Sequence, residues 1–139
     1  MDRMDRGVVS MLYIALTGIT KQVLNDLLDR KIRTLEVRSA HNLYSLFQLN
    51  AGDYVFITTT SKQDLVGGVT GIIAKIRELQ VTMHRVAHGI DSYYEEKETL
   101  FARVQLEFKG LGRIRKVQDL GIGKPVSVDA EEIRHFEAR

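Results

Sequence analysis

The sequence predicts an α+β fold, a small mixed β-barrel with two or three short helices. Two helical stripes fall among the first three strand-like segments, whereas the later strand-like segments follow one another with only turns between them. The apolar phase flips by one residue inside residues 72–86, which is the mark of a β-bulge. Glycines recur at the joins, and sheets with bulges and glycine corners commonly curl into barrels.

The first half of the chain predicts three strands and two helices. Thr20 can cap the first helix and Ser39 the second, because a hydroxyl at this position accepts a hydrogen bond from a free N–H group of the first turn. Tyr54 and Phe56 share one face of the third strand, and we expect both in the core. The strands are predicted over residues 8–16, 33–38 and 54–59, and the helices over residues 21–29 and after Ser39, with the stripe Leu43, Leu46 and Phe47.

The second half predicts strands joined by turns, followed by one last helix. Residues 87–99 predict a polar loop or an irregular helix, because they show no apolar period. Gly110 and Gly112 predict a turn, and Asp129 predicts the cap of a last helix that reaches Phe136. The strands are predicted over residues 72–86, 102–109, 113–117 and 126–128.

Length and composition fit one folded domain. A chain of 139 residues buries roughly 68–70% of the surface that its unfolded form exposes, which is enough for a proper core. We expect a flexible extension over residues 1–7 and a single domain over residues 8–139. The absence of Cys excludes disulfides, thiolate metal sites and a Cys nucleophile. No segment reaches the roughly 18 uninterrupted apolar residues of a spanning helix, so we expect a cytoplasmic protein without a membrane partner.

One segment carries a resemblance to a known family. Residues 31–38 read Lys-Ile-Arg-Thr-Leu-Glu-Val-Arg, and they resemble the signature Gly-x-Lys-x-x-Glu-x-Arg of ASCH domains, the activating-signal-cointegrator homology family. Glu36 and Arg38 match directly, Arg33 stands for the Lys, and Lys31 replaces the Gly.

A second motif follows about fourteen residues later. Gly52-Asp53-Tyr54-Val55 resembles the Gly-Asp-x-Val entry to the next strand in ASCH and related PUA-like barrels. The two motifs cover residues 20–60, and the whole chain also looks like a family of small archaeal proteins of unknown function. The resemblance implies a PUA-like pseudobarrel, and most members of that superfamily bind RNA.

The matching residues have a clear physical use. Strand alternation puts Glu36 and Arg38 on a polar face, and an Arg there offers planar paired donors to a phosphate or a base edge. The neighbouring Glu can orient the Arg or accept from a base amino group. The alternative is that Arg33, Glu36 and Arg38 merely pair across strands on a solvated face, where ion pairs are often inert.

A second basic segment offers phosphate contacts. The net charge of +2 is below the strong basic bias of a general nucleic-acid coat, but residues 109–124 are locally basic. Arg113, Arg115 and Lys116 could grip successive phosphates. A solvated strand face is again the alternative, and both basic segments would have to converge for one RNA surface.

Other chemistries find little support in the sequence. His84 and His88 have the spacing of a helical metal pair, but a strand is predicted there and the Glu of a zinc protease is missing. The glycine-rich segments 67–71 and 121–124 lack phosphate-loop signatures. We therefore predict no cofactor and no metal.

The sequence thus predicts a binding module for RNA or a modified nucleotide, with no catalysis evident. Its predicted site residues are Arg33, Glu36, Arg38, Arg113, Arg115 and Lys116. One alternative is an ASCH-type hydrolase of nucleosides or RNA, in which Lys21, Thr34 and Glu36 would supply a nucleophile and base. Lys21 lies in the first turn of a polar-faced helix, which argues against that alternative. The other alternative is a protein-interaction domain, and the sequence predicts no oligomeric state.

Overall fold

The computed structural model describes residues 10–90, 93–119, 121 and 124–133, with backbone only over residues 84–90 and 93–99. The predicted extension over residues 1–7 and Phe136 of the predicted last helix lie outside these residues. The elements are β1 (Ser10–Leu16), α1 (Lys21–Arg30), β2 (Ile32–Val37), α2 (Ala40–Leu46), β3 (Tyr54–Ile57), the 3₁₀ turn η2 (Lys62–Asp64), β4 (Thr70–Ile90), β5 (Tyr93–Asp119) and β6 (Val126–Ile133).

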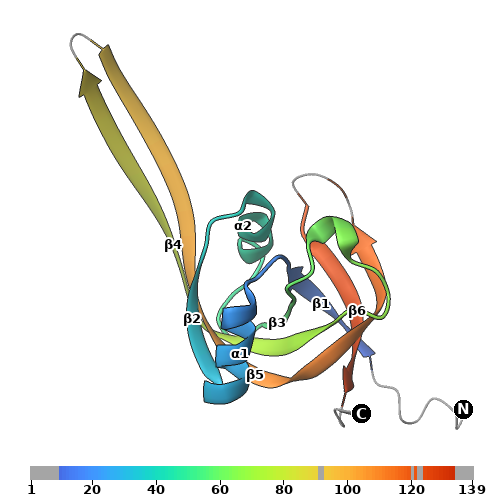
Figure 1. Cartoon of the computed structure of the whole chain (residues 1–139). Helices are drawn as coiled ribbons and strands as arrows, with labels where there is room; N and C mark the ends of the chain where they lie inside the picture. The colour runs from blue at the N-terminus through green and yellow to red at the C-terminus, as the bar shows by residue number, and fades with distance from the viewer. Residues whose placement is uncertain (1–9, 91–92, 120, 122–123, 134–139) are drawn as a thin grey trace, which may run out of the picture.

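The six strands form one mixed sheet in the order β2-β5-β4-β3-β1-β6, and β5 also pairs with β6. The pairings therefore return on themselves through β5, β4, β3, β1 and β6, and β2 is added to β5 outside this circuit. The pairing of β1 with β3 is parallel and the other pairings are antiparallel. Figure 1 shows α1 and α2 beside this sheet, with β2 at one side of the molecule and β6 at the other. The fold is thus mixed α+β, as predicted.

Of the two side-chain caps predicted in the first half, the one at Thr20 is confirmed and the one at Ser39 is not. The Thr20 hydroxyl accepts from the backbone N–H of Val23, at 3.4 Å, and thereby caps α1. Ser39 occupies the corresponding position before α2, but its side chain makes no capping hydrogen bond. Lys31 ends α1 in the left-handed conformation, with φ of 72°. None of the described helices is long and apolar enough to cross a membrane.

Two apolar cores lie on opposite faces of the sheet. The first packs the apolar sides of α1 and α2, such as Leu27 and Leu46, against β2 and the neighbouring strands. The second draws side chains from all five strands of the circuit, so it fills the space that the circuit encloses. Its members include Ala15, Phe56, Ile73, Ile114 and Val128. The prediction for Phe56 is confirmed, but Tyr54 is 45% exposed because it lies at the open end of this core.

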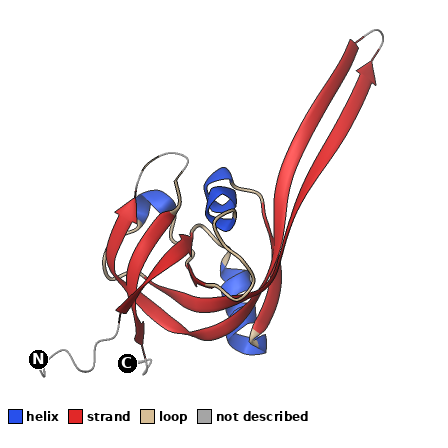
Figure 2. Cartoon of the chain, turned by 180° about the vertical axis from the view of Figure 1, so that it is seen from behind, coloured by secondary structure: helices blue, strands red, loops and turns tan. Residues whose placement is uncertain are grey.

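The predicted loop or irregular helix over residues 87–99 is wrong. β4 and β5 continue through this region as a two-stranded arm that projects from the body, and Figure 2 shows the same strands curving beneath the body. The paired residues run in register from Met83 and Leu100 to Ile90 and Tyr93. A ribbon that leaves the body has no face buried by the core, so its strands need not show the alternation that reveals a strand in the sequence.

The predicted turn at Gly110 and Gly112 is also wrong, because β5 passes through both glycines without a break. Gly112 is the register partner of Gly71, and the ring of Phe56 lies against both backbones. A Cβ atom on Gly71 would lie 2.7 Å from a ring carbon of Phe56. These glycines therefore make room for a large core side chain inside a strand, and they do not mark its end.

The predicted bulge in residues 72–86 is confirmed, and the predicted last helix is wrong. The β4–β5 register shifts between Ile76 and Glu78, at the point where the apolar phase changes. Residues 130–133 continue β6, which pairs with β1 on one side and with β5 on the other. Pairing on both edges outweighs the local capping signal of one Asp.

Candidate functional site: a charged hollow beside β2

A hollow of about 640 Å³ opens beside β2. Side chains of β2 form one wall, the segment from Gly18 to the start of α1 forms another, and α2 and β5 each contribute a polar side chain. The polar lining of the hollow includes Thr34, Glu36, Arg38, Asn42 and Arg103. The volume lies within the range of about 300–1,000 Å³ that is usual for pockets that bind small molecules.

The carboxylate of Glu36 holds two guanidinium groups at the rim of the hollow. Arg38 donates to Glu36 Oε1 through Nη2 at 2.7 Å, and Arg103 Nη2 lies 3.6 Å from Glu36 Oε2. Glu36 and Arg103 are register partners on β2 and β5. Both arginine side chains are more than half exposed, at 58% and 59%. Two cations thus share one carboxylate while keeping donors free toward solvent.

An aromatic ring fixes the position of Arg38. Its guanidinium carbon lies 4.9 Å from the centre of the Phe101 ring, which is within the range of a cation–π interaction. Phe101 itself is buried at the base of the arm. The hydrogen bond to Glu36 and the contact with this ring therefore restrict the guanidinium to one side of the rim.

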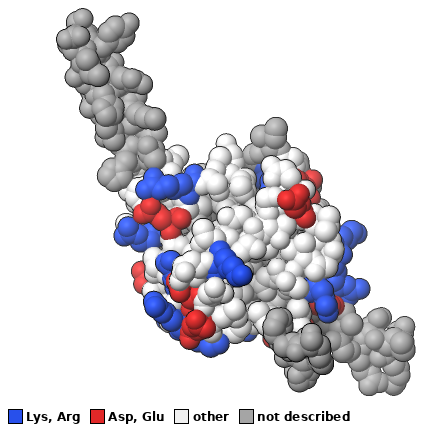
Figure 3. Space-filling view, viewed as in Figure 1, with Lys and Arg blue, Asp and Glu red and all other residues white. Residues whose placement is uncertain are grey.

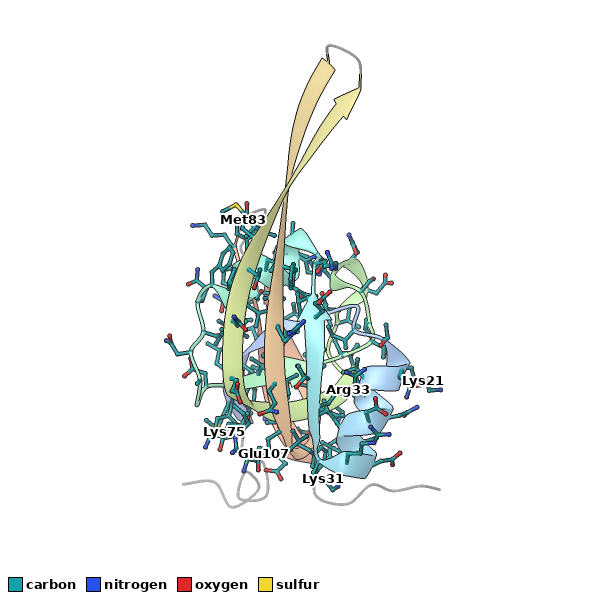
Figure 4. All side chains as sticks on the ribbon, turned by 90° about the vertical axis from the view of Figure 1, so that its left-hand side faces the viewer. Lys21, Lys31, Arg33, Lys75, Met83 and Glu107 are labelled. Atoms are coloured by element: carbon teal, nitrogen blue, oxygen red, sulfur yellow. The ribbon has the colours of Figure 1, made fainter. Side chains whose placement is uncertain are left out.

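Arg33 is committed to the helix next to it. Its Nε donates to Asp26 Oδ2 at 2.8 Å, and a second guanidinium nitrogen donates to the carbonyl of Thr34. The hydrogen bond from Arg33 to Asp26 holds the pKa of the Asp26 carboxyl below its usual value. Figure 4 shows Arg33 on the side of β2 that faces α1. Arg33 lines the hollow, but its contacts tie α1 to β2.

The residues of the hydrolase alternative are only partly assembled. Thr34 and Glu36 line the hollow. Lys21 is exposed at the start of α1, is not among the lining residues, and in Figure 4 projects away from β2.

The second basic segment lies elsewhere on the molecule. Arg113, Arg115 and Lys116 are exposed on the part of β5 that pairs with β6, about ten residues beyond Arg103, which is on the order of 30 Å along a strand. The register shifts between Ile114 and Lys116, so Arg115 is a bulged residue. Arg113 pairs with Glu131 of β6 at 3.3 Å. The structure does not bring the two predicted basic segments into one hollow.

The charge pattern agrees with this separation. On the face drawn in Figure 3, the described Lys and Arg side chains lie in separate groups with Asp and Glu between them. One wide basic field is not seen on this face. Such a mixed surface favours local recognition over general electrostatic coating.

Sequence reasoning missed two residues of the hollow. Arg103 is one of the polar residues that alternate with the apolar side chains of β5, and only the register of β2 on β5 places it against Glu36. Asn42 is buried and lines the same hollow from α2. An exposed-looking Asn in a helix gives no sequence signal for such a role.

The described residues contain no group of three or more His, Asp or Glu side chains that could hold a metal ion. The backbone of β4 is extended at His84 and His88, so the helical spacing considered for a metal pair does not apply. Their side chains lie outside the described part of the chain.

These features define a mixed α+β domain with a surface hollow rimmed by two arginines that share one glutamate. The chain belongs to the family described as protein of unknown function DUF473, which matches residues 11–128. It is also similar to an uncharacterized protein of Methanocaldococcus jannaschii, with 31% identity over 116 residues, covering 84% of this chain and 72% of the relative. The predicted likeness to an archaeal family of unknown function is confirmed.

Proposed function

We propose that this chain is a binding module for RNA or a modified nucleotide, and that the hollow beside β2 receives the ligand. The observation that carries the proposal is the pair of guanidinium groups, Arg38 and Arg103, held by the single carboxylate of Glu36. One carboxylate cannot neutralise two guanidinium groups, so the rim keeps an excess positive charge. Guanidinium groups bind phosphate through paired N–H donors, and here their donors are already oriented.

The rest of the hollow fits a nucleotide. Its inner wall includes the apolar side chains Val23 and Leu35, against which a base or sugar can pack. Thr20 and the start of α1 contribute the positive end of a helix dipole, which weakly favours an anion. The carboxylate of Glu36 can also accept from a base amino group.

We further propose that the closed circuit of strands is a PUA-like pseudobarrel and that the protein acts in the cytoplasm. The ASCH signature has Gly where this chain has Lys31, and that residue ends α1 in the left-handed conformation that Gly adopts most readily. Although the residue differs from the signature, Lys31 therefore keeps the backbone geometry that a Gly would favour. The return of the pairings through β5 and β6 also supports this architecture.

The proposal is tested by the binding of transfer RNA and of a short single strand at two salt concentrations. The double variant Arg38→Gln/Arg103→Gln should lower the affinity at least tenfold, because hydrogen bonds to charged groups contribute about 1.5–3 kcal/mol each. Arg113→Gln/Lys116→Gln is the matched control with the same change in charge on the far part of β5. In wild type the affinity should fall steeply with salt. Salt-independent binding, or equal losses in the two double variants, would contradict the proposed site.

A hydrolase remains the second candidate because Thr34 and Glu36 both line the hollow. Incubation with N4-acylated cytidines and with single-stranded RNA separates the two functions. A binding module should give no turnover above buffer. Turnover that is lost in Thr34→Ala and in Glu36→Gln would favour the hydrolase.

A further inference from the structure

A second hollow lies at the open end of the strand circuit. It has a volume of about 490 Å³ and shares no lining residue with the hollow beside β2. Its lining residues are Met11, Tyr13, Tyr54, Ile73, Lys109 and Glu132. We call it the mouth, because its floor is Ile73 of the core that fills the circuit.

Two tyrosines form adjacent walls of the mouth. β1 and β3 are parallel, and Ile14 is the register partner of Val55, so Tyr13 and Tyr54 occupy neighbouring positions just before that pair. Tyr13 packs partly against the enclosed core, whereas Tyr54 as a residue is almost half exposed. Burial, with the nearby Glu132 and Tyr54, raises the pKa of Tyr13, which keeps its phenol a neutral hydrogen-bond donor.

The charged groups of the mouth are placed by irregularities in β5. Ile73 pairs with Gly110 and the next residue of β4 pairs with Phe108, so Lys109 is a bulged residue between them. Bulges redirect side chains and are frequent beside functional sites. The carboxylate of Glu132 lies across the backbone of Gly110, where an added Cβ atom would be 3.0 Å from Oε2.

The charge balance selects the class of ligand. A cage of aromatic rings and one carboxylate would suit an alkylammonium ion. Here Lys109 lines the mouth, and Lys75 is the register partner of Tyr54 and lies at the same end of the sheet (Figure 4). Lys109 also pairs with Glu107, at 3.4 Å, and Glu107 is the register partner of Lys75. The two lysines therefore balance two carboxylates at this end, which disfavours a simple cation and suits a ligand that carries both an anionic group and a hydrogen-bond donor.

We propose that the mouth binds a nucleotide whose base stacks on Tyr54 and Tyr13. Lys109 contacts the phosphate, and Glu132 accepts from an exocyclic amino group of the base. Aromatic side chains are general stacking platforms for bases, and a carboxylate distinguishes cytosine, which carries an amino group, from uracil, which does not. The site is independent of the arginine-rimmed hollow and does not rest on its function.

The test is a calorimetric or NMR titration of the full chain with cytidine 5′-monophosphate, uridine 5′-monophosphate and cytidine. We expect the cytidine monophosphate to bind about tenfold more tightly than the uridine monophosphate, since uracil places a carbonyl oxygen against Glu132 where cytosine has its amino group. Free cytidine should bind more weakly than its monophosphate because it gives Lys109 no phosphate. Equal affinities for the three compounds would overturn the proposal, and so would tighter binding of an aromatic amino acid.

Three variants locate the binding at the mouth. Tyr54→Ala should weaken cytidine monophosphate binding about tenfold through lost stacking. Tyr44→Ala is the matched control, since Tyr44 on α2 is 46% exposed, almost the same as Tyr54. Lys109→Gln should remove the difference between cytidine and its monophosphate. Gly110→Ala should push Glu132 aside and reduce the preference over uridine monophosphate, and Gly110 does not have the positive φ that would strain an Ala.

Two results, one for Tyr54→Ala and one for the Arg38→Gln/Arg103→Gln double variant, decide the proposal. Thermal melting should show that each variant is folded, and an unchanged affinity in folded Tyr54→Ala would overturn the proposal. Arg38→Gln/Arg103→Gln should leave mononucleotide binding at the mouth intact. If that double variant abolishes the binding while Tyr54→Ala does not, the nucleotide occupies the hollow beside β2 and the mouth is not a nucleotide site.

Discussion

The side chain of Asn42 binds both backbone groups of Thr17. The Thr17 N–H donates to Asn42 Oδ1 at 3.0 Å, and Asn42 Nδ2 donates to the Thr17 carbonyl at 2.8 Å. Asn42 is only 3% exposed, and Thr17 follows directly after β1. One amide thus takes the place of a strand partner where the sheet ends, and it fixes α2 against β1 beside the arginine-rimmed hollow.

Replacement of this amide should be costly. Asn42→Ala leaves one buried donor and one buried acceptor of Thr17 unpaired, and each costs about 1–3 kcal/mol. We expect the free energy of unfolding to fall by about 2–4 kcal/mol in chemical denaturation. Asn50→Ala in the exposed turn before β3 is the control, and it should change stability by less than about 0.5 kcal/mol. Equal effects of the two substitutions would contradict this role of Asn42.

A second prediction concerns the paired glycines of β4 and β5. In Gly71→Ala the new Cβ atom would overlap the carbonyl oxygen of Ile57 and lie 2.7 Å from the ring of Phe56. Backbone and a packed ring cannot yield easily, so we expect a loss of about 3 kcal/mol or more in chemical denaturation.

Gly110→Ala in the same region is the matched control for this prediction. Its Cβ atom would meet only the mobile end of Glu132, at 3.0 Å, and the carboxylate can move. A loss below about 1 kcal/mol is therefore expected. If Gly71→Ala were equally mild, the close approach of Phe56 would not limit this part of the sheet.

The sequence could predict the parts of the fold that depend on neighbouring residues, but not those that depend on distant strands. The cap at Thr20 and the alternation of β2 depend on neighbouring residues, and both were found from the sequence. The arm over residues 87–99 and the unbroken course of β5 through Gly112 depend on pairing with distant strands. Long-range pairing leaves a clear periodic signal only where one face of the strand is buried, which explains these errors.

The same distinction between local and long-range signals applies to the residues of the candidate site. Glu36 lies in β2 and Arg38 follows directly after its last residue, Val37, so alternation was enough to predict that they share a polar face, and both line the hollow. Arg103 reaches Glu36 only through the register of β2 on β5. Arg33 shares the strand and lines the hollow too, but Asp26 of α1 holds its guanidinium, which the strand pattern could not show.

This difference gives a third prediction, for Arg33. Arg33→Gln should lower the melting temperature while leaving RNA affinity nearly unchanged, because the guanidinium binds Asp26 and not the rim. Arg38→Gln is the control with the opposite pattern, since its exposed guanidinium contributes little to stability. A loss of RNA affinity in Arg33→Gln equal to that in Arg38→Gln would show that Arg33 binds the ligand directly.

The Arg33 contribution should also depend on pH. The pKa of Asp26 is lowered from its ordinary 3.8, chiefly by the hydrogen bond from Arg33. The unfolded chain therefore takes up this proton first as the pH falls, so the stabilisation is present above that value and is lost below it. The difference in melting temperature between wild type and Arg33→Gln should be full at neutral pH and should shrink below about pH 4.

The last prediction concerns His41, which precedes Asn42 in α2 and also contacts Thr17, the residue after β1. Its Nε2 lies 2.8 Å from the Thr17 hydroxyl, and burial, followed by the positive charge of Lys62, lowers its pKa below the ordinary 6.5. The unfolded chain therefore binds the His41 proton at a higher pH than the folded chain does. The stabilisation is present above about pH 6.5 and is lost as the pH falls further.

Denaturation of wild type and His41→Gln at pH 7.5, 6.5 and 5.5 checks this prediction. The stability of wild type should fall more over this range than that of the variant. The other titratable groups are the same in both proteins and cancel in the difference, and carboxyl groups such as Glu107, whose pKa is lowered from its ordinary 4.5, lose their stabilisation mainly at lower pH. A stability advantage of wild type over His41→Gln that grows as the pH falls would mean that the protonated form of His41 is the one that the fold prefers.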